Sequence, residues 1–270
     1  MLDNKTGIKI IVPTINTELL DSFLVNLYVN TFYSYSFFIC FDGCSSYESK
    51  MNQLIVNHKL KSDMYLTQSK NEGAIVALNK AIKFCDDVEY VGIFNDDVLF
   101  SPPSNTCWLT KMIKYLDNHP KIAACSANWY WPENNDYQKF LNNVVDEDIK
   151  NKDKTRDGLQ ACFYIIRKNV IDELIQRNGY FIDEGYFFYW ADPDLVYRIN
   201  KLGYECKVLL DVNLFHIGGA TASKNPNSQK WYDAGKERFL NKFNAPKNID
   251  FKVWDSIYYY KQGDEMVQFK

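Results

Sequence analysis

Two adjacent aspartates follow an apolar stretch in the segment VEYVGIFNDDVLF, residues 88–100. The run from Tyr90 to Phe94 has aromatic and β-branched residues without a periodic polar face, which predicts a strand buried on both sides. Asn95, Asp96 and Asp97 come directly after it. Neighbouring carboxylates repel each other unless water, a cation or a helix terminus offsets the repulsion. We therefore interpret this point as a candidate cation site; a solvated turn before the following Ser-Pro-Pro is the alternative.

A second acidic pair lies in FFYWADPDLVYR, residues 187–198. Pro193 suits the first turn of a helix, which predicts Asp192 at the N-cap and Asp194 in the first turn. Asp192 could serve only as this cap. The functional interpretation is that a partly desolvated carboxylate beside Tyr189 and Trp190 acts as a general base toward a sugar hydroxyl.

The third candidate is His216, one of three histidines in the chain. A lone histidine is more often structural than ligating. Here, however, two glycines follow at 218 and 219, and they let the backbone approach a ligand closely. A neutral imidazole can complete an oxygen-rich manganese site, so we predict His216 as a metal ligand.

Strands and helices alternate in the first half of the chain, and this alternation can bring the candidates together. We predict strands at 7–13, 36–41, 64–67 and 90–94, with helices at 18–30, 48–59 and 74–84 between them. Such an order implies right-handed crossovers and a mostly parallel α/β sheet flanked by helices. The carboxyl ends of its strands would gather Pro13, Thr14, Asp42 and residues 95–97 around a nucleotide-sized crevice.

The second half continues with mixed elements. We expect helices at 107–118, 168–177 and 228–243, and strands at 121–128, 158–167 and 205–210. The polar segment 133–157 is predicted as a long loop or an inserted excursion, either a lid or a plain surface insertion.

Composition excludes several classes of protein. The chain has 270 residues, a net charge of -3 and no long Lys/Arg run, which argues against nucleic-acid binding. Its apolar runs are too short to span a bilayer, so we predict a cytoplasmic protein without an integral membrane segment and leave peripheral membrane contact open. Seven scattered cysteines favour buried free thiols over zinc ligands or disulfides. Neither GxGxxG after the first strand nor a P-loop occurs, but a divalent cation could still hold a nucleotide's phosphates.

Taken together, the motifs and their order resemble the inverting, nucleotide-sugar-dependent glycosyltransferases of the GT-A fold, in particular family 2. The resemblance covers about residues 7–245. The segments that carry it are VPT at 12–14, DG at 42–43, NEG…N with Asn71, Gly73 and Asn79, NDD at 95–97, the FFYWADPDLVYR block, and HIGG at 216–219.

The resemblance implies a GT-A (Rossmann-like nucleotide-binding) α/β fold with a small antiparallel extension on the acceptor side. Residues 1–245 would form one domain, with a nucleotide-sugar half (1–128) and an acceptor half (129–245), and 246–270 would be an extension. It further implies a UDP- or dTDP-sugar donor, Mn²⁺ or Mg²⁺, and a glycan or other hydroxyl acceptor, in a hexosyltransferase-type reaction. The implied donor-binding residues are Pro13, Thr14, Asn16, Asp42, Asn71, Gly73, Asn79, Asn95 and Asp96. The implied metal ligands are Asp97 and His216, the base is Asp192, and the acceptor-binding residues are Trp129, Trp131, Tyr189 and Trp190.

Three positions depart from the family pattern. Asn95 replaces the first carboxylate of the usual DxD, Ala191 replaces the glutamate that often precedes the base, and Asp42-Gly43 lacks a doubled aspartate. Two other functions therefore stay open at this point: a catalytically silent carbohydrate-binding relative, in which the aromatic residues stack sugars, and a nucleotidyltransferase. The sequence leaves the oligomeric state undetermined.

Overall fold

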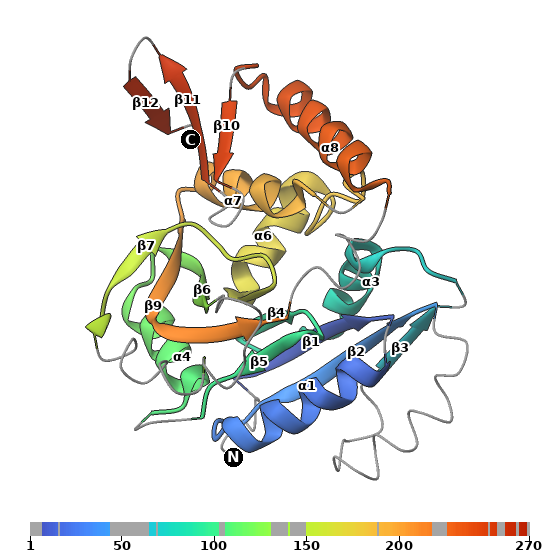
Figure 1. The fold of residues 1–270 in the computed structure, drawn as a ribbon, viewed down its shortest axis with the longest axis vertical. Helices are drawn as coiled ribbons and strands as arrows, with labels where there is room; N and C mark the ends of the chain where they lie inside the picture. The colour runs from blue at the N-terminus through green and yellow to red at the C-terminus, as the bar shows by residue number, and fades with distance from the viewer. Residues whose placement is uncertain are drawn as a thin grey trace.

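The computed structural model describes residues 7–15, 17–43, 65–68, 70–102, 106–130, 140, 150–187, 189–217, 226–247, 249–252, 257–262 and 265–268. Its main element is a nine-stranded sheet (Figure 1). The strands of this sheet are β1 (Ile8–Thr14), β2 (Ser36–Asp42), β3 (Tyr65–Gln68), β4 (Tyr90–Phe94), β5 (Val98–Phe100), β6 (Ile122–Tyr130), β7 (Thr155–Asp157), β8 (Phe163–Arg167) and β9 (Glu205–His216). The helices are α1 (Thr17–Asn30), α3 (Ala74–Ala81), the 3₁₀ turn η1 (Ile82–Phe84), α4 (Trp108–Asn118), α6 (Lys168–Asn178), α7 (Ala191–Lys201) and α8 (Ser228–Phe243).

The strand order is β3-β2-β1-β4-β8-β6-β9-β5, and β7 pairs with β9 off this path. β3, β2, β1 and β4 are parallel. β8 is antiparallel to both β4 and β6, and β6 is parallel to β9, so β6 and β9 run in the same direction as β4. The carboxyl ends of β1, β2, β4, β6 and β9 therefore lie along one edge of the sheet.

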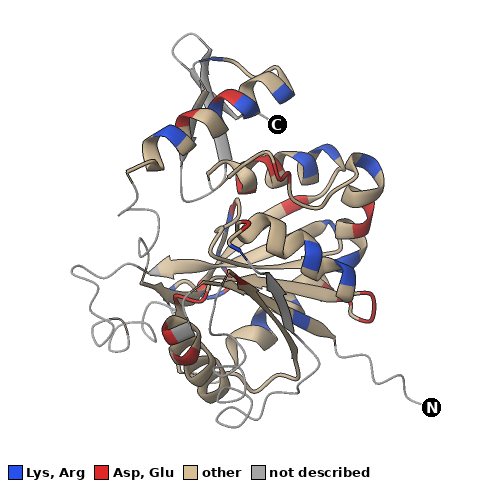
Figure 2. Cartoon of the chain, turned by 90° about the vertical axis from the view of Figure 1, so that its right-hand side faces the viewer, with Lys and Arg blue, Asp and Glu red and all other residues tan. Residues whose placement is uncertain are grey.

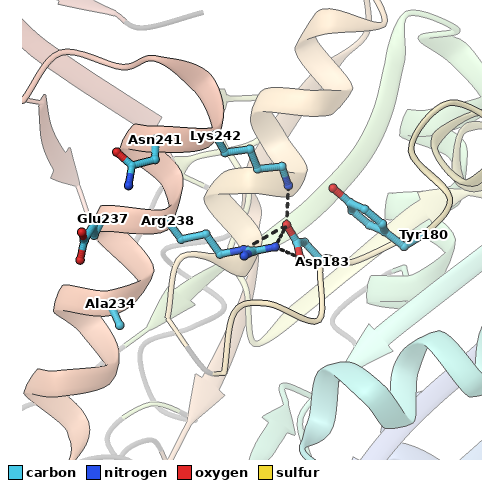
Figure 3. Close-up of a pocket in the computed structure, with 7 residues that line it drawn as sticks. All are labelled: Tyr180, Asp183, Ala234, Glu237, Arg238, Asn241 and Lys242. Carbon is cyan, nitrogen blue, oxygen red and sulfur yellow. Dashed lines mark hydrogen bonds and ion pairs between the residues drawn. The ribbon is translucent and has the colours of Figure 1, made fainter.

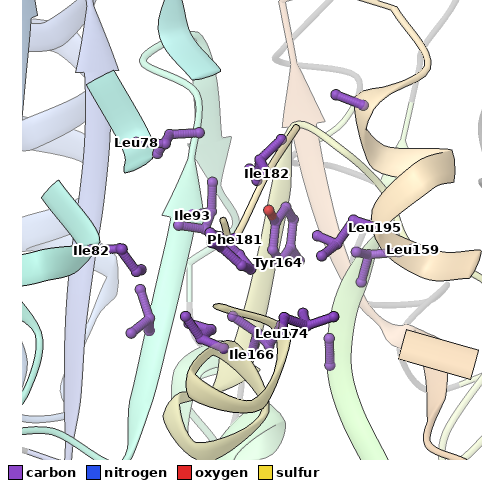
Figure 4. Packing of buried hydrophobic residues seen from close by; sticks show 14 of the residues in the cluster. Leu78, Ile82, Ile93, Leu159, Tyr164, Ile166, Leu174, Phe181, Ile182 and Leu195 are labelled. Carbon is purple, nitrogen blue, oxygen red and sulfur yellow. The ribbon is translucent and has the colours of Figure 1, made fainter. Parts of the chain in front are cut away.

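Two apolar cores cover the two faces of the sheet. Along β1, Ile8, Ile10 and Val12 belong to the core under α1 and α4, whereas Ile11 belongs to the core under α3, α6, α7 and α8. This alternation follows from the two-residue period of a strand. Figure 4 shows the second core, in which the side chain of Tyr164, from β8, lies beside the α7 residue Leu195.

The sheet agrees with the predicted mostly parallel α/β fold, but several strand bounds differ, and β8 begins at Phe163 rather than at residue 158. β9 does not stop at Leu210 but continues to His216, and the sequence signals did not predict the three-residue strands β5 and β7. Short strands carry too few residues to show a period, and their pairing with β9 comes from distant parts of the chain. The helix predicted at 48–59 and most of the segment 133–157 lie outside the described residues.

β9 contains a pronounced irregularity beside β6. Ala127 pairs with Leu209, but the next residue, Asn128, pairs with Asn213, so residues 210–212 of β9 are extra at this point. Such a bulge bends the strand and redirects its end. Beyond it, β9 pairs with β5 as well as β6, and His216 lies opposite Val98.

The last described segment forms a separate three-stranded antiparallel sheet of β10 (Ile249–Lys252), β11 (Ile257–Gln262) and β12 (Glu265–Gln268). The six cysteines in the described residues are buried free thiols, as predicted; Cys44 lies outside these residues. None of the described helices combines the length and apolar character needed to cross a membrane. Figure 2 shows acidic and basic residues interspersed along the chain.

Candidate functional site

Asp42, at the carboxyl end of β2, is buried and accepts two backbone hydrogen bonds. The donors are the amides of Glu72 at 2.7 Å and Gly73 at 2.8 Å. These amides precede α3, where the helix leaves N–H groups unpaired, so the carboxylate caps the helix and is stabilised by its positive end. Asp42 thereby fixes the turn that contains Asn71.

This turn needs glycine at two points. Gly43 has φ +78°, and a Cβ added to it would lie 2.4 Å from the backbone nitrogen of Asn71. Gly73 has φ +98°, and its amide donates to Oδ1 of Asn71 at 3.0 Å. The backbone around Asn71 is therefore held close to the end of β2. Gly43 and Gly73 have a backbone conformation that residues with a side chain rarely adopt.

Thr14 and Asp96 connect the ends of β1 and β4. The Thr14 hydroxyl donates to Oδ2 of Asp96 at 2.6 Å. Burial raises the pKa of Asp96 to about 6, and the nearby Asp97 carboxylate acts in the same direction, against the lowering effect of the Thr14 hydrogen bond. Asn95 remains exposed and donates its backbone amide to the carbonyl of Cys162 at 2.9 Å. Pro13 is half-buried beside Thr14.

Asp97 and His216 meet although 119 residues separate them in the chain. The imidazole Nε2 lies 2.8 Å from Oδ1 of Asp97, and the amide of Ile217 donates to the Asp97 carbonyl at 3.0 Å. Burial lowers the pKa of His216, but interactions with Cys162 and Asp97 outweigh this effect and raise the pKa to about 10. The ring of Trp129 lies 4.4 Å from that of His216.

A hard divalent cation could take the place of the proton that joins His216 to Asp97, because metal binding releases protons from its ligands. Two neighbouring ligands of an octahedral ion lie about 3 Å apart when the bonds are about 2.1 Å long, which matches the Nε2–Oδ1 separation. In addition, Nδ1 of His216 is buried and has no hydrogen-bond partner among the described residues. Within that same part of the chain, no third His, Cys, Asp or Glu completes a metal-binding group. An ion here would take its other ligands from water and phosphate, as Mg²⁺ commonly does.

Asp192 lies in the first turn of α7, on the face of the sheet that carries Tyr164. The Asp192 charge contributes to the raised pKa of the Tyr164 phenol, and Tyr164 pairs with Ile93, two residues before Asn95. Asp192 therefore lies near Tyr164, on the same face of the sheet. Burial raises the pKa of Asp192 to about 6, partly offset by a backbone hydrogen bond.

The N-cap of α7 differs from the prediction. It is Trp190, with φ +76°, and Asp192 is the second residue of the helix. The helix begins earlier because the chain enters it through a left-handed turn, which the sequence pattern does not reveal. A bulky residue in this region costs about 1–3 kcal/mol and needs support from its surroundings.

The aromatic residues expected to bind the acceptor differ in their surroundings. Trp190 is 2% exposed and packs against Tyr232 and Phe239, so the predicted sugar-stacking role of Trp190 is wrong: no ring face is open to solvent. Tyr189 is half-buried near Tyr232, and Trp129 packs on His216. Trp131 and the expected donor residue Asn16 lie outside the described residues.

Asn79 joins α3 to the loop before α7. Its side-chain amide donates to the Ile182 carbonyl at 2.7 Å and to the Glu184 carboxylate at 3.0 Å, while its carbonyl oxygen accepts from the Ile182 amide at 3.0 Å. These contacts give Asn79 a structural role, and its expected part in donor binding stays a prediction.

Sequence reasoning missed a buried charge network behind α7. Asp194 is fully buried and pairs with Arg198 and Lys242, while Asp183 pairs with Arg238 and the same Lys242. The four-residue spacing of Asp194 and Arg198 was the available signal. Figure 3 shows the adjoining hollow of about 610 Å³ between α8 and the loop before α7. None of the predicted site residues lines it.

Comparison with known proteins identifies the family of the chain. The family model described as "Glycosyl transferase family 2" matches residues 9–175, more than half of the chain. The chain belongs to glycosyl transferase family 2. The observed fold, a mixed and mostly parallel sheet flanked by helices, is the fold expected from the sequence for this family. The matched residues include Asp42, Asp96 and Asp97.

Solved structures show the same fold at low sequence identity. The mannosyltransferase PcManGT from Pyrobaculum calidifontis, in complex with GDP-Man and Mn²⁺, has a TM-score of 0.60 and 18% identity over 89% of this chain. S. aureus TarS 1-349 has a TM-score of 0.55 and 15% identity over 87% of this chain, and TarS 1-349 is also similar in its complex with UDP. This chain spans just under two thirds of their length, 65% and 66%. Among curated proteins, no match was found.

Proposed function

We propose that this family 2 glycosyltransferase is metal-dependent and inverting, and that it transfers a sugar from a nucleoside-diphosphate sugar to a hydroxyl group of a glycan or other acceptor. The observation that carries the proposal is the Asp97–His216 contact at the ligand edge of the sheet. Thr14, Asp96 and the turn held by Asp42 lie at the ends of strands along this edge.

On the donor side, Asp97 and His216 would hold Mn²⁺ or Mg²⁺. When bound, such an ion neutralises charge that develops on a leaving diphosphate. Thr14, Asp96 and the Asn71–Gly73 turn would contact the nucleoside. A UDP- or dTDP-linked hexose is the donor that we propose, and a GDP-linked sugar belongs in the test because GDP-Man is bound to the similar PcManGT.

On the acceptor side, Asp192 would act as the general base. Its pKa of about 6 leaves it mostly ionised at pH 7, yet basic enough to receive a proton from a hydroxyl group. The deprotonating acceptor oxygen forms a bond to the anomeric carbon while the bond to the diphosphate oxygen breaks on the opposite face. This displacement inverts the anomeric configuration, and Asp192 keeps the proton.

The test is product analysis with UDP-, dTDP- and GDP-sugars in the presence of Mn²⁺. We expect one donor to give a nucleoside diphosphate and a transferred sugar of inverted configuration, and Asp97→Ala to abolish metal-dependent donor binding. Pyrophosphate as product would instead indicate a nucleotidyltransferase. Binding of a donor without release of nucleoside diphosphate, across a panel of sugar acceptors, would indicate a silent relative.

A further inference from the structure

Helix α8 packs tightly against the turn that leads into Asp192. Gly235, in the middle of α8, is buried, and a Cβ added to it would lie 2.8 Å from the Tyr189 carbonyl oxygen and 2.9 Å from Cδ1 of Trp190. Neither atom is the free end of a flexible side chain. The helix can approach the turn this closely only because residue 235 has no side chain.

Aromatic packing from α8 covers the same turn. Tyr232 and Phe239 lie on either side of Gly235 in the helix, with ring centroids 5.6 Å and 5.4 Å from that of Trp190. Trp190 has the left-handed φ of +76°, which a bulky side chain adopts only where the surrounding structure imposes it. α8 supplies this surrounding structure.

Charged residues of α8 hold the chain on both sides of the turn, and Figure 3 shows the contacts with Asp183, before the turn. Arg238 donates to both carboxylate oxygens of Asp183, at 2.8 Å and 3.0 Å. Lys242 donates to Asp183 at 2.6 Å and also to Asp194, which is fully buried in α7. One ammonium group therefore joins the loop before the turn to the helix after it.

We propose that Gly235 and Lys242 are positioning residues: α8 imposes the left-handed turn at Trp190 and thereby directs Asp192 toward the acceptor hydroxyl. This inference rests on the proposed role of Asp192 as the base. It assigns to α8 a part in the chemical step although its own side chains need not touch either substrate.

The decisive variant is Gly235→Ala. In an exposed helix alanine is more favourable than glycine, so the substitution does not weaken α8 by itself. The new methyl group must, however, displace the Trp190 turn by about half an ångström to reach ordinary contact. Since a displacement of about 1 Å can cost about 100-fold in rate, we expect kcat to fall about tenfold. The Kd of the nucleotide sugar with Mn²⁺ should not change, because those contacts lie at the ends of β1, β4 and β9.

Asp233→Ala is the matched control, because Asp233 is exposed on the same helix and contacts Gln229 within it. We expect it to keep the parental kcat. Lys242→Met is a second test: Asp183 keeps Arg238 and Asp194 keeps Arg198, so the protein retains partners for both carboxylates. It should lower kcat with unchanged donor Kd.

Amide hydrogen exchange separates this inference from the proposed function. We expect Gly235→Ala to exchange faster than the parent in residues 189–194, with a melting temperature lowered only by the overpacking cost of about 1–3 kcal/mol. Parental kcat in Gly235→Ala, or unchanged exchange in that segment, would overturn the positioning role. If the parent protein itself transferred no sugar, the proposed function would fall, and the exchange rates alone would decide whether α8 restrains the turn.

Discussion

Replacing Asp192 by asparagine should lower activity and raise stability at the same time. Burial raises the pKa of this carboxyl from 3.8 to about 6, so the folded protein disfavours the ionised form. The difference corresponds to at most about 3 kcal/mol of unfolding free energy. Asparagine is similar in size and carries no charge, so Asp192→Asn avoids this cost.

The effect depends on pH with a definite sign. A carboxyl whose pKa is raised by folding contributes stability below its unfolded pKa and loses that contribution as the pH rises through about 6. The advantage of Asp192→Asn should therefore be about half of its full value at pH 5 and complete at pH 8. There, about 2–3 kcal/mol would raise the melting temperature by roughly 5–10 °C. Loss of the general base should lower kcat by about two to four orders of magnitude, with donor binding retained.

Thermal unfolding at pH 5 and pH 8, alongside transfer kinetics at saturating donor, measures both effects. Asp194→Asn is the matched control from the same helical turn. Asp194 is paired with Arg198 and Lys242, so breaking these buried pairs should destabilise the protein by about 3–5 kcal/mol, opposite in sign. An Asp192→Asn protein that is less stable than the parent at pH 8, or that transfers sugar at the parental rate, would refute the reasoning.

Three further predictions concern the same edge of the sheet. Because Asp192 must be ionised to accept a proton, kcat at saturating donor should fall about tenfold from pH 7 to pH 5; an unperturbed carboxyl would give almost no change over this range. His216→Ala should weaken Mn²⁺ binding at least tenfold in a calorimetric titration, because Asp97 loses the ligand atom beside it, and unchanged affinity would exclude His216 as a ligand. Asp42→Ala should cost about 1–3 kcal/mol in urea denaturation, since two part-buried amides before α3 lose their acceptor; a smaller loss would show that water replaces the carboxylate.

Elements with a strong local signal were predicted well from the sequence. β4 was predicted at its observed bounds, and β1 and β2 within one residue, because each is a largely apolar run, interrupted in β1 only by Lys9, with a polar or turn-forming residue at its end. The end of β9 was missed for the opposite reason. Asn213 looks like a turn residue, but it is buried and hydrogen-bonded to Asn128 of the neighbouring strand.

The same difference between local signals and long-range contacts applies to the candidate site. The resemblance to the family implied that Asp97 and His216 lie in one site, and their side chains do meet. The turn at Trp190 could not be predicted, because its left-handed conformation depends on a helix that follows more than thirty residues later. Local propensity carries no information about such long-range support.

Because of the bulge in β9, the direction in which the His216 side chain points depends on the number of residues in the bulge. Residues 210–212 act as a spacer between two registers, one shared with the middle of β6 and the other with β5. Removing or adding one residue in this spacer would reverse which face of the strand each later side chain occupies, and the imidazole would point away from Asp97. Homologous enzymes that keep this ion pair are thus expected to tolerate changes of sequence in the spacer much better than changes of its length.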